Sequence, residues 1–183
     1  DENFQFKADD MLAAADEDTR VMWLCSPNNP TGNALDANEI EKLLKSFDGI
    51  VVVDEAYIDF SSQPSWSKRL TEFPNLIVLQ TLSKAWASAG IRLGMAFASE
   101  AIISLFNKVK YPYNINILTQ KMATERVREK AEVDLWVKTL LEERGKMAEQ
   151  IASLNCVEKV YPTDANFLLV KVNDANKAYQ HLV

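Results

Sequence analysis

The chain has 183 residues, of which 48% are hydrophobic and 25% charged, a composition that is ordinary for a globular protein and excludes a disordered chain. Its formal net charge is −6 and its pI about 4.9, which argues against a nucleic-acid partner. No apolar run approaches the length of a membrane span and no signal peptide is visible, so we expect a cytoplasmic protein without membrane contact.

The chain offers little thiol or imidazole chemistry. Cys25 and Cys156 lie far apart and neither has a CxxC neighbour, so we expect reduced thiols. His181 is the only histidine, which argues against histidine-based catalytic triads and histidine-ligated metals. We therefore expect no metal site.

Hydrophobic periodicity predicts helices that alternate with strands. The expected helices cover residues 7–15, 36–47, 99–109, about 115–128, about 131–154 and 174–183, and a short helical turn covers 85–89. The expected strands cover residues 21–25, 50–53, 75–79, 93–98, 157–161 and 166–172. This order is typical of an α/β layered fold.

The helix expected at 36–47 has clear local signals at both ends. Asp36 precedes it as an N-cap, and Glu39 occupies the capping-box position. Gly49 follows the end of the helix, where a residue with positive φ is often required.

Polar side chains follow two of the apolar strands. The loop after residues 21–25 is broken by two prolines and a glycine and contains Asn29. The strand at 50–53 runs directly into Asp54 and Tyr57. If the strands are parallel neighbours, these loops open at the same edge of the sheet, where open α/β sheets bind their ligands.

The loop after the strand at 75–79 is the one around which we expect the site to form. It contains Thr81, Ser83 and Lys84, and Arg92 lies eight residues past the lysine. A lysine just beyond a buried strand can lose part of its hydration, which lowers the pKa of the ammonium and frees a nucleophilic amine. Hydroxyls and a guanidinium bind a phosphate monoester. An amine that attacks an aldehyde, beside a phosphate cradle, describes a site for pyridoxal phosphate (PLP).

Together these stretches resemble the PLP-dependent aminotransferases of fold type I, and among them most closely the histidinol-phosphate aminotransferases. The matching stretches lie in family order and are SPNNPTGN (26–33), VVVDEAYIDF (51–60), QTLSKAWASAGIRLG (80–94) and YPYNIN (111–116). Each stretch alone is weakly specific, and the set is highly specific.

The resemblance implies a role for each matching residue around the cofactor ring. Asn29 and Tyr57 would bind the phenolic oxygen of PLP, and Asp54 would face the pyridine nitrogen and keep it protonated. Lys84 would bind the cofactor as a Schiff base and then shuttle the proton.

The resemblance also implies a phosphate site. Ser83 and Arg92 match phosphate ligands of the family, and Thr81 is a weaker candidate. Tyr111 and Asn114 fall in a stretch near the substrate side of the family's site and receive no specific role.

The fold that the resemblance implies is an α/β, three-layer PLP-transferase fold like that of aspartate aminotransferase, with a mostly parallel sheet. Residues 1–128 would be part of the large PLP-binding domain, and residues 129–183 a linking helix and the start of the small C-terminal domain. We expect a chain truncated at both ends, because the family's Gly-rich phosphate turn, stacking aromatic ring and C-terminal arginine have no match. Arg126, Arg128 and Arg144 are expected on surface helix faces and are not candidates for that arginine. For the same reason we expect this chain alone to be inactive.

The implied reaction is the transamination of histidinol phosphate with 2-oxoglutarate to imidazole-acetol phosphate and glutamate, in histidine biosynthesis. The implied partners are amino acid and keto acid substrates and a second copy in a homodimer. Three alternatives stay open: an aminotransferase for aromatic amino acids, a threonine-phosphate decarboxylase, and a PLP-sensing domain of a regulator. A non-catalytic α/β domain is a further alternative, but it would require the occurrence of Asn29, Asp54, Tyr57, Lys84 and Arg92 in one chain to be a coincidence.

Overall fold

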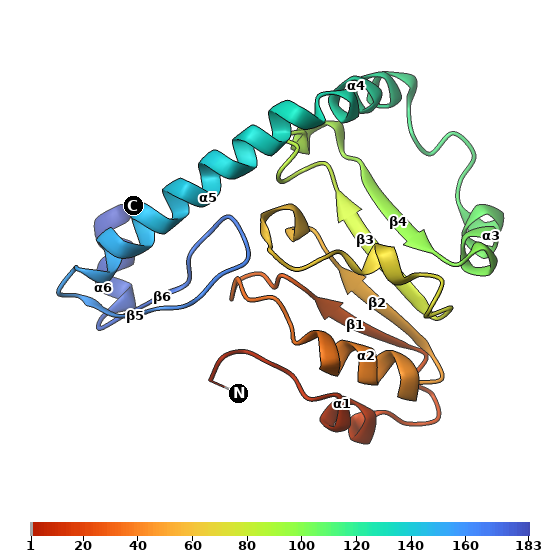
Figure 1. Ribbon diagram of the computed structural model, residues 1–183, viewed down its shortest axis with the longest axis horizontal. Helices are drawn as coiled ribbons and strands as arrows, with labels where there is room; N and C mark the ends of the chain where they lie inside the picture. Colours follow the sequence, from red (N-terminus) through yellow and green to blue (C-terminus); the bar gives the residue numbers. More distant parts are fainter. Residues whose placement is uncertain (1) are drawn as a thin grey trace.

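The computed structural model describes residues 2–183 and shows a sheet with its flanking helices, three connecting helices and a small hairpin (Figure 1). We call residues 2–98 the sheet unit and residues 153–183 the hairpin unit. The sheet unit contains α1 (Ala8–Ala14), β1 (Val21–Cys25), α2 (Ala37–Ser46), β2 (Ile50–Asp54), β3 (Leu76–Thr81) and β4 (Gly94–Ala98), with the 3-10 turns η1 (Ile58–Phe60), η2 (Trp66–Arg69) and η3 (Ala89–Ile91). The connecting helices are α3 (Glu100–Val109), α4 (Ile117–Arg128) and α5 (Lys130–Ala152), and the hairpin unit contains β5 (Val157–Val160), β6 (Val170–Val172) and α6 (Ala175–Leu182).

The main sheet has the order β1-β2-β3-β4, in which the first three strands are parallel and β4 runs antiparallel to β3. The expected α/β fold with a mostly parallel sheet is confirmed. In the register, Cys25 lies beside Asp54 and Asp54 beside Leu79. The carboxyl ends of β1, β2 and β3 therefore meet at one edge, and the loops with the candidate site residues begin there.

The core of the sheet unit lies between the sheet and the helices α1 and α2. Side chains from alternate positions of the parallel strands point to this face, as the period of two in a strand requires. They pack against Ile40 and Leu43 of α2, which are both completely buried. The strand residues on this face are Met22, Leu24, Val51, Val53, Leu76 and Val78. On the other face of the sheet Trp23 is 64% exposed, so the two faces are covered unequally in this chain.

The N-terminal end of α2 differs in one respect from the expectation. Asp36 caps the helix as predicted, because its carboxylate accepts a hydrogen bond from Asn38 N at 2.8 Å. Glu39 does not complete a capping box. Its Oε2 accepts a hydrogen bond from Ala8 N at 2.7 Å and so caps α1 instead.

The C-terminal end of α2 is held by a distant asparagine. Asn75 Nδ2 lies 3.2 Å from the carbonyl oxygens of Leu44, Phe47 and Gly49. Gly49 does not have the positive φ that its position suggested. A Cβ there would lie 2.5 Å from Arg20 O, so close packing requires the glycine.

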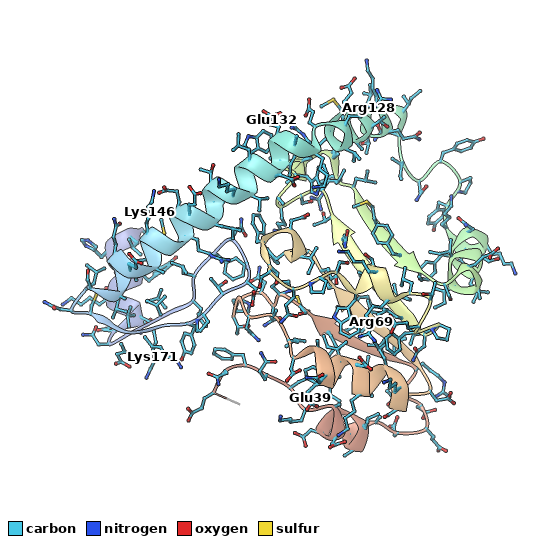
Figure 2. The ribbon with its side chains drawn as sticks, viewed as in Figure 1. Glu39, Arg69, Arg128, Glu132, Lys146 and Lys171 are labelled. Carbon is cyan, nitrogen blue, oxygen red and sulfur yellow. The ribbon has the colours of Figure 1, made fainter. Side chains whose placement is uncertain are left out.

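Arg69, labelled within the sheet unit in Figure 2, is the centre of a network of charged side chains. Its guanidinium donates to Glu41 Oε2 at 2.8 Å and to Glu72 Oε2 at 2.6 Å. The hydrogen bond from Lys45 to Glu41, together with the one from Arg69 to Glu41, lowers the pKa of the Glu41 carboxyl to about 2. Arg69 also covers the ring of the buried Trp66 at 5.1 Å, which joins the network to the core.

Three expectations outside the main sheet require correction. Residues 85–88 form a non-helical turn, and the helical turn expected at 85–89 is instead η3, which begins at Ala89. The strand expected at 166–172 is limited to β6. Arg144 does not lie on a solvent-facing side of α5, because its Nη1 donates to Ala165 O at 2.6 Å. Among residues 2–183, no helix has both the length and the apolarity needed to span a bilayer.

Candidate active site

The loops after β1 and β2 bring Asn29 and Tyr57 together. Asn29 Nδ2 donates to Tyr57 Oη at 2.9 Å. The Tyr57 ring is 6% exposed, whereas Asn29 is exposed. Gly32 closes the first loop with a φ of 82° and an N–H that donates to Asn28 O at 2.7 Å. A fixed amide and a fixed phenol are thus presented side by side.

Asp54 lies at the end of β2, as expected, and is half-buried. Its Oδ1 accepts a hydrogen bond from Ala56 N at 3.0 Å. The carboxyl lines a depression of about 390 Å³ beside β3 and β4, which Thr81 and Met95 also line. Burial raises the pKa of the neighbouring Cys25 thiol, and the charge of Asp54 adds to the increase.

Lys84 lies in the loop after β3, next to the Asn29–Tyr57 pair. Its Nζ is 5.2 Å from the centroid of the Tyr57 ring. Lys84 is exposed, so the loss of hydration that we expected from its sequence position does not occur in this chain. The backbone turns sharply here, because Ala87 N donates to Lys84 O at 3.0 Å and Ala87 has a φ of 51°.

The three candidate phosphate ligands are only partly assembled. Thr81 Oγ1 lies 2.9 Å from Ser83 Oγ and accepts a hydrogen bond from Ser83 N at 3.1 Å. Arg92 is exposed, has a φ of 54°, and donates from Nη1 to Ala89 O at 3.0 Å within its own turn. Within residues 2–183, no hydrogen bond joins Arg92 to Ser83. The left-handed backbone at Ala87 and Arg92 marks this loop as strained.

Glu55 is a buried carboxylate at this edge that sequence reasoning did not single out. Its Oε2 accepts hydrogen bonds from Ser65 Oγ at 2.5 Å and Gln80 Nε2 at 2.9 Å, and its Oε1 accepts one from Trp66 N at 2.7 Å. Burial raises the pKa of the Glu55 carboxyl. It ties the end of β2 to η2 and β3. No sequence signal distinguished it from its neighbour Asp54.

The functional groups at this edge of the sheet are of the types that PLP requires. The fit rests on the Asn29–Tyr57 pair, which supplies donors for a phenolate, and on the amine of Lys84 beside the same ring. Asp54 supplies a carboxylate on a neighbouring strand end, and the hydroxyls of Thr81 and Ser83 supply donors for a phosphate.

Comparison with known proteins gives one family. The family model described as aminotransferase class I and II matches residues 1–183. A histidinol-phosphate aminotransferase from Bacteroides thetaiotaomicron is 56% identical over 183 residues, which are 100% of this chain and 53% of that protein. The chain therefore spans about half the length of this curated relative.

Two solved structures show the same fold. A decarboxylase from Sulfurospirillum multivorans has a TM-score of 0.81 at 27% identity, with 95% of this chain and 52% of that chain covered. A histidinol-phosphate aminotransferase from Sinorhizobium meliloti, in complex with pyridoxal-5'-phosphate, has a TM-score of 0.83 at 21% identity, with 97% and 49% covered.

Proposed function

The chain belongs to the aminotransferase class I and II family, and we propose that the whole protein is a PLP-dependent aminotransferase of histidine biosynthesis. The observation that carries the proposal is the Asn29–Tyr57 hydrogen bond with the Lys84 amine 5.2 Å from the same ring. It occurs in a chain that is 56% identical to a histidinol-phosphate aminotransferase.

Four residues would serve the cofactor ring. PLP, when bound, supplies an electron sink for the charge left when an amino acid loses its α-proton. Asn29 and Tyr57 would hold the phenolic oxygen from two adjoining loops, and Asp54 would hold a proton on the ring nitrogen. Lys84 Nζ would bind the cofactor aldehyde carbon and then carry the substrate proton.

The cofactor phosphate would be held by the loop after β3. Ser83 and Thr81 already present their hydroxyls 2.9 Å apart at one place. Arg92 would complete the set by turning its guanidinium from Ala89 O toward these hydroxyls.

We assign histidinol phosphate and 2-oxoglutarate as the substrates, with imidazole-acetol phosphate and glutamate as the products. The support is the identity of 56% to the Bacteroides thetaiotaomicron protein over the full length of this chain. The whole protein would be a cytoplasmic homodimer.

We place the boundary between the large domain and the linking helix at residues 128 and 129. Glu129 is both the C-cap of α4 and the N-cap of α5, so one helix ends and the next begins at this residue. Residues 1–128 would belong to the PLP-binding domain, and residues 129–183 to the linking helix and the small domain. The chain by itself would be inactive, which agrees with the exposure of Asn29, Lys84 and Arg92 to water.

The alternatives differ in how well they fit the sequence. The likeness to a decarboxylase structure supports decarboxylation as the second candidate reaction, and the threonine-phosphate decarboxylase suggested by the sequence is of this kind. The identity to that structure is 27%, about half of the 56% to the Bacteroides thetaiotaomicron aminotransferase. No separate observation favours an aminotransferase for aromatic amino acids or a PLP-sensing regulator domain.

The test is a transamination assay on the purified full-length protein with PLP. We expect glutamate to form from histidinol phosphate and 2-oxoglutarate with a kcat/KM about 100-fold above that for phenylalanine. Release of carbon dioxide from threonine phosphate, without glutamate, would replace the proposal with the decarboxylase. The absence of a visible PLP absorbance band would reject PLP chemistry altogether.

Two matched variants test the assignment of the ring carboxylate. Asp54→Ala is expected to weaken PLP binding and activity far more than Asp59→Ala, because only Asp54 ends β2 at the site edge. Equal effects of the two substitutions would show that the assignment of Asp54 is wrong.

A further inference from the structure

The loop between β5 and β6, residues 161–169, reaches back from the hairpin unit to the sheet unit (Figure 1). Asp164 N donates to Gly32 O at 2.7 Å, and Thr163 Oγ1 donates to the same oxygen at 3.3 Å. Gly32 lies three residues after Asn29 in the loop that follows β1. The contact leaves no room for a side chain at position 32, since a Cβ there would lie 2.4 Å from Thr163 Oγ1.

The carboxylate of Asp164 bridges the two loops that carry Asn29 and Tyr57. Its Oδ2 accepts a hydrogen bond from Ala34 N at 3.1 Å, in the loop after β1. Its Oδ1 accepts one from Ser61 Oγ at 3.2 Å, just past the turn that follows Tyr57. One side chain therefore fixes the separation of two loops that lie far apart in sequence.

Phe167 contacts the Tyr57 ring directly. The two ring centroids are 5.2 Å apart and the planes meet at 85°, an edge-to-face contact. Lys84 Nζ also approaches the Tyr57 ring, at 5.2 Å. Because Tyr57 is buried between these neighbours, the direction of its hydroxyl toward Asn29 depends on where Phe167 lies.

The loop is itself held from α5. Arg144 Nη1 donates to Ala165 O at 2.6 Å, and Ala165 is completely buried. Val137 and Leu141 of α5 pack against the same cluster as Tyr57 and Ala165. The position of the loop therefore follows the position of the long helix.

We propose that Asp164 and Phe167 are positioning residues for the Asn29–Tyr57 pair: Asp164 sets the separation of the two loops, and Phe167 sets the plane of the phenol. The inference rests on the proposed function, in which the pair holds the phenolic oxygen of PLP. In this proposal both residues act through the Asn29–Tyr57 pair and not by binding the cofactor. Their effect is to keep both donors aimed at one point.

The test uses the full-length protein with PLP and four variants. Phe167→Leu removes the ring edge, and Tyr161→Leu is its control, since Tyr161 lies in the same loop but packs against Phe4 at 5.2 Å. Asp164→Ala removes both bridging bonds, and Asp164→Asn keeps groups able to bond Ala34 N and Ser61 Oγ. Two readouts are followed: the pH midpoint of the absorbance of bound PLP, and hydrogen exchange of residues 28–35 and 55–61.

We expect Phe167→Leu and Asp164→Ala to raise the pH midpoint by roughly half a unit or more, because misaligned donors stabilise the anionic oxygen less. Exchange in the two segments should become at least about threefold faster. Tyr161→Leu and Asp164→Asn should behave as the wild type.

The outcomes separate this inference from the proposed function. A wild-type protein without a PLP band would reject the proposed function. A wild-type band together with unchanged midpoints and exchange in both Phe167→Leu and Asp164→Ala would overturn the positioning role. If Phe167→Leu does not fold, the contrast between Asp164→Ala and Asp164→Asn decides alone.

Discussion

The sheet unit and the part of the chain after residue 100 bury their apolar side chains very differently. All but three of the buried hydrophobic residues of the described chain lie in the sheet unit, and the exceptions are Ala123, Val133 and Ala165. Large apolar side chains on the connecting helices are open to water, and Ile117 and Leu118 of α4 are 79% and 72% exposed. The sheet unit thus has its own hydrophobic core, whereas the later helices have apolar side chains that are exposed to solvent in this chain.

This difference in packing indicates which parts of the chain hold the loops of the candidate site in place. Asn29, Tyr57 and Lys84 lie on loops at the rim of the well-packed unit, so the strands fix where these loops begin. The other side of the loops is held by the small cluster that Tyr57 and Phe60 share with Ala165 of the hairpin unit. This cluster is small compared with the main core, so we expect the site loops to be more sensitive to the hairpin unit than the strands are.

The largest expected effect tests the main contrast directly. Leu43→Ala on α2 removes a completely buried side chain and should cost about 2–5 kcal/mol of unfolding free energy. Leu140→Ala on α5 removes a side chain that is 45% exposed and should cost about 1 kcal/mol or less. Urea denaturation of the 183-residue chain and of these two variants of it measures both losses, and equal losses would abolish the contrast.

A second pair of substitutions should have opposite signs in the two regions. Gly32→Ala places a methyl group at a φ of 82° and within 2.4 Å of Thr163 Oγ1, so it should destabilise the protein. The left-handed backbone alone accounts for about 1–2 kcal/mol. Gly145 lies in α5, and a Cβ at this position would meet no atom within 4 Å. Gly145→Ala should therefore stabilise the protein by about 0.5–1 kcal/mol.

Thermal denaturation of the two glycine variants provides the measurement. Adding Thr163→Gly to Gly32→Ala should recover the part of the loss that comes from the collision. If Gly32→Ala is as stable as the wild type, the contact between the hairpin unit and the loop after β1 is not formed in solution.

The smallest expected effect concerns the response to acid. The pKa of Glu41 is lowered to about 2 from its ordinary 4.5 by hydrogen bonds from Lys45 and Arg69, so its carboxylate stabilises the fold above pH 4.5. This stabilisation is lost as the pH falls from 4.5 toward 2. Glu41→Gln should therefore lower the denaturation midpoint at neutral pH, and its difference from the wild type should shrink toward pH 2.

Glu143→Gln on α5 is the matched control for that titration. Glu143 pairs with Lys146 at 2.7 Å, but both side chains are at least 60% exposed, and among residues 2–183 no second salt bridge joins this pair, unlike at Glu41. We expect little change at any pH. If Glu143→Gln changed the denaturation midpoint as much as Glu41→Gln does, the network around Arg69 would stabilise the protein no more than a simple surface ion pair.

Local patterns in the sequence predicted most of the sheet unit. The apolar run of Val51, Val52 and Val53 indicated a buried strand, and Asp36 indicated the start of α2, because both signals depend only on neighbours in the chain. The positions of Asn29, Asp54 and Lys84 after strands placed them at one edge once the strands proved parallel. The domain boundary and the roles of the individual site residues stay predictions.

Only the tertiary structure decided which distant groups meet. Glu39 caps α1 rather than its own helix, and Gly49 is required by Arg20 O rather than by its own φ. Arg144 binds Ala165 O, and Lys84 remains exposed because no described segment covers its loop. Hydrophobic periodicity states which side of an element is buried, but it carries no information about the partner that buries it. These contacts join residues 21 or more positions apart, and the sequence alone could not assign them.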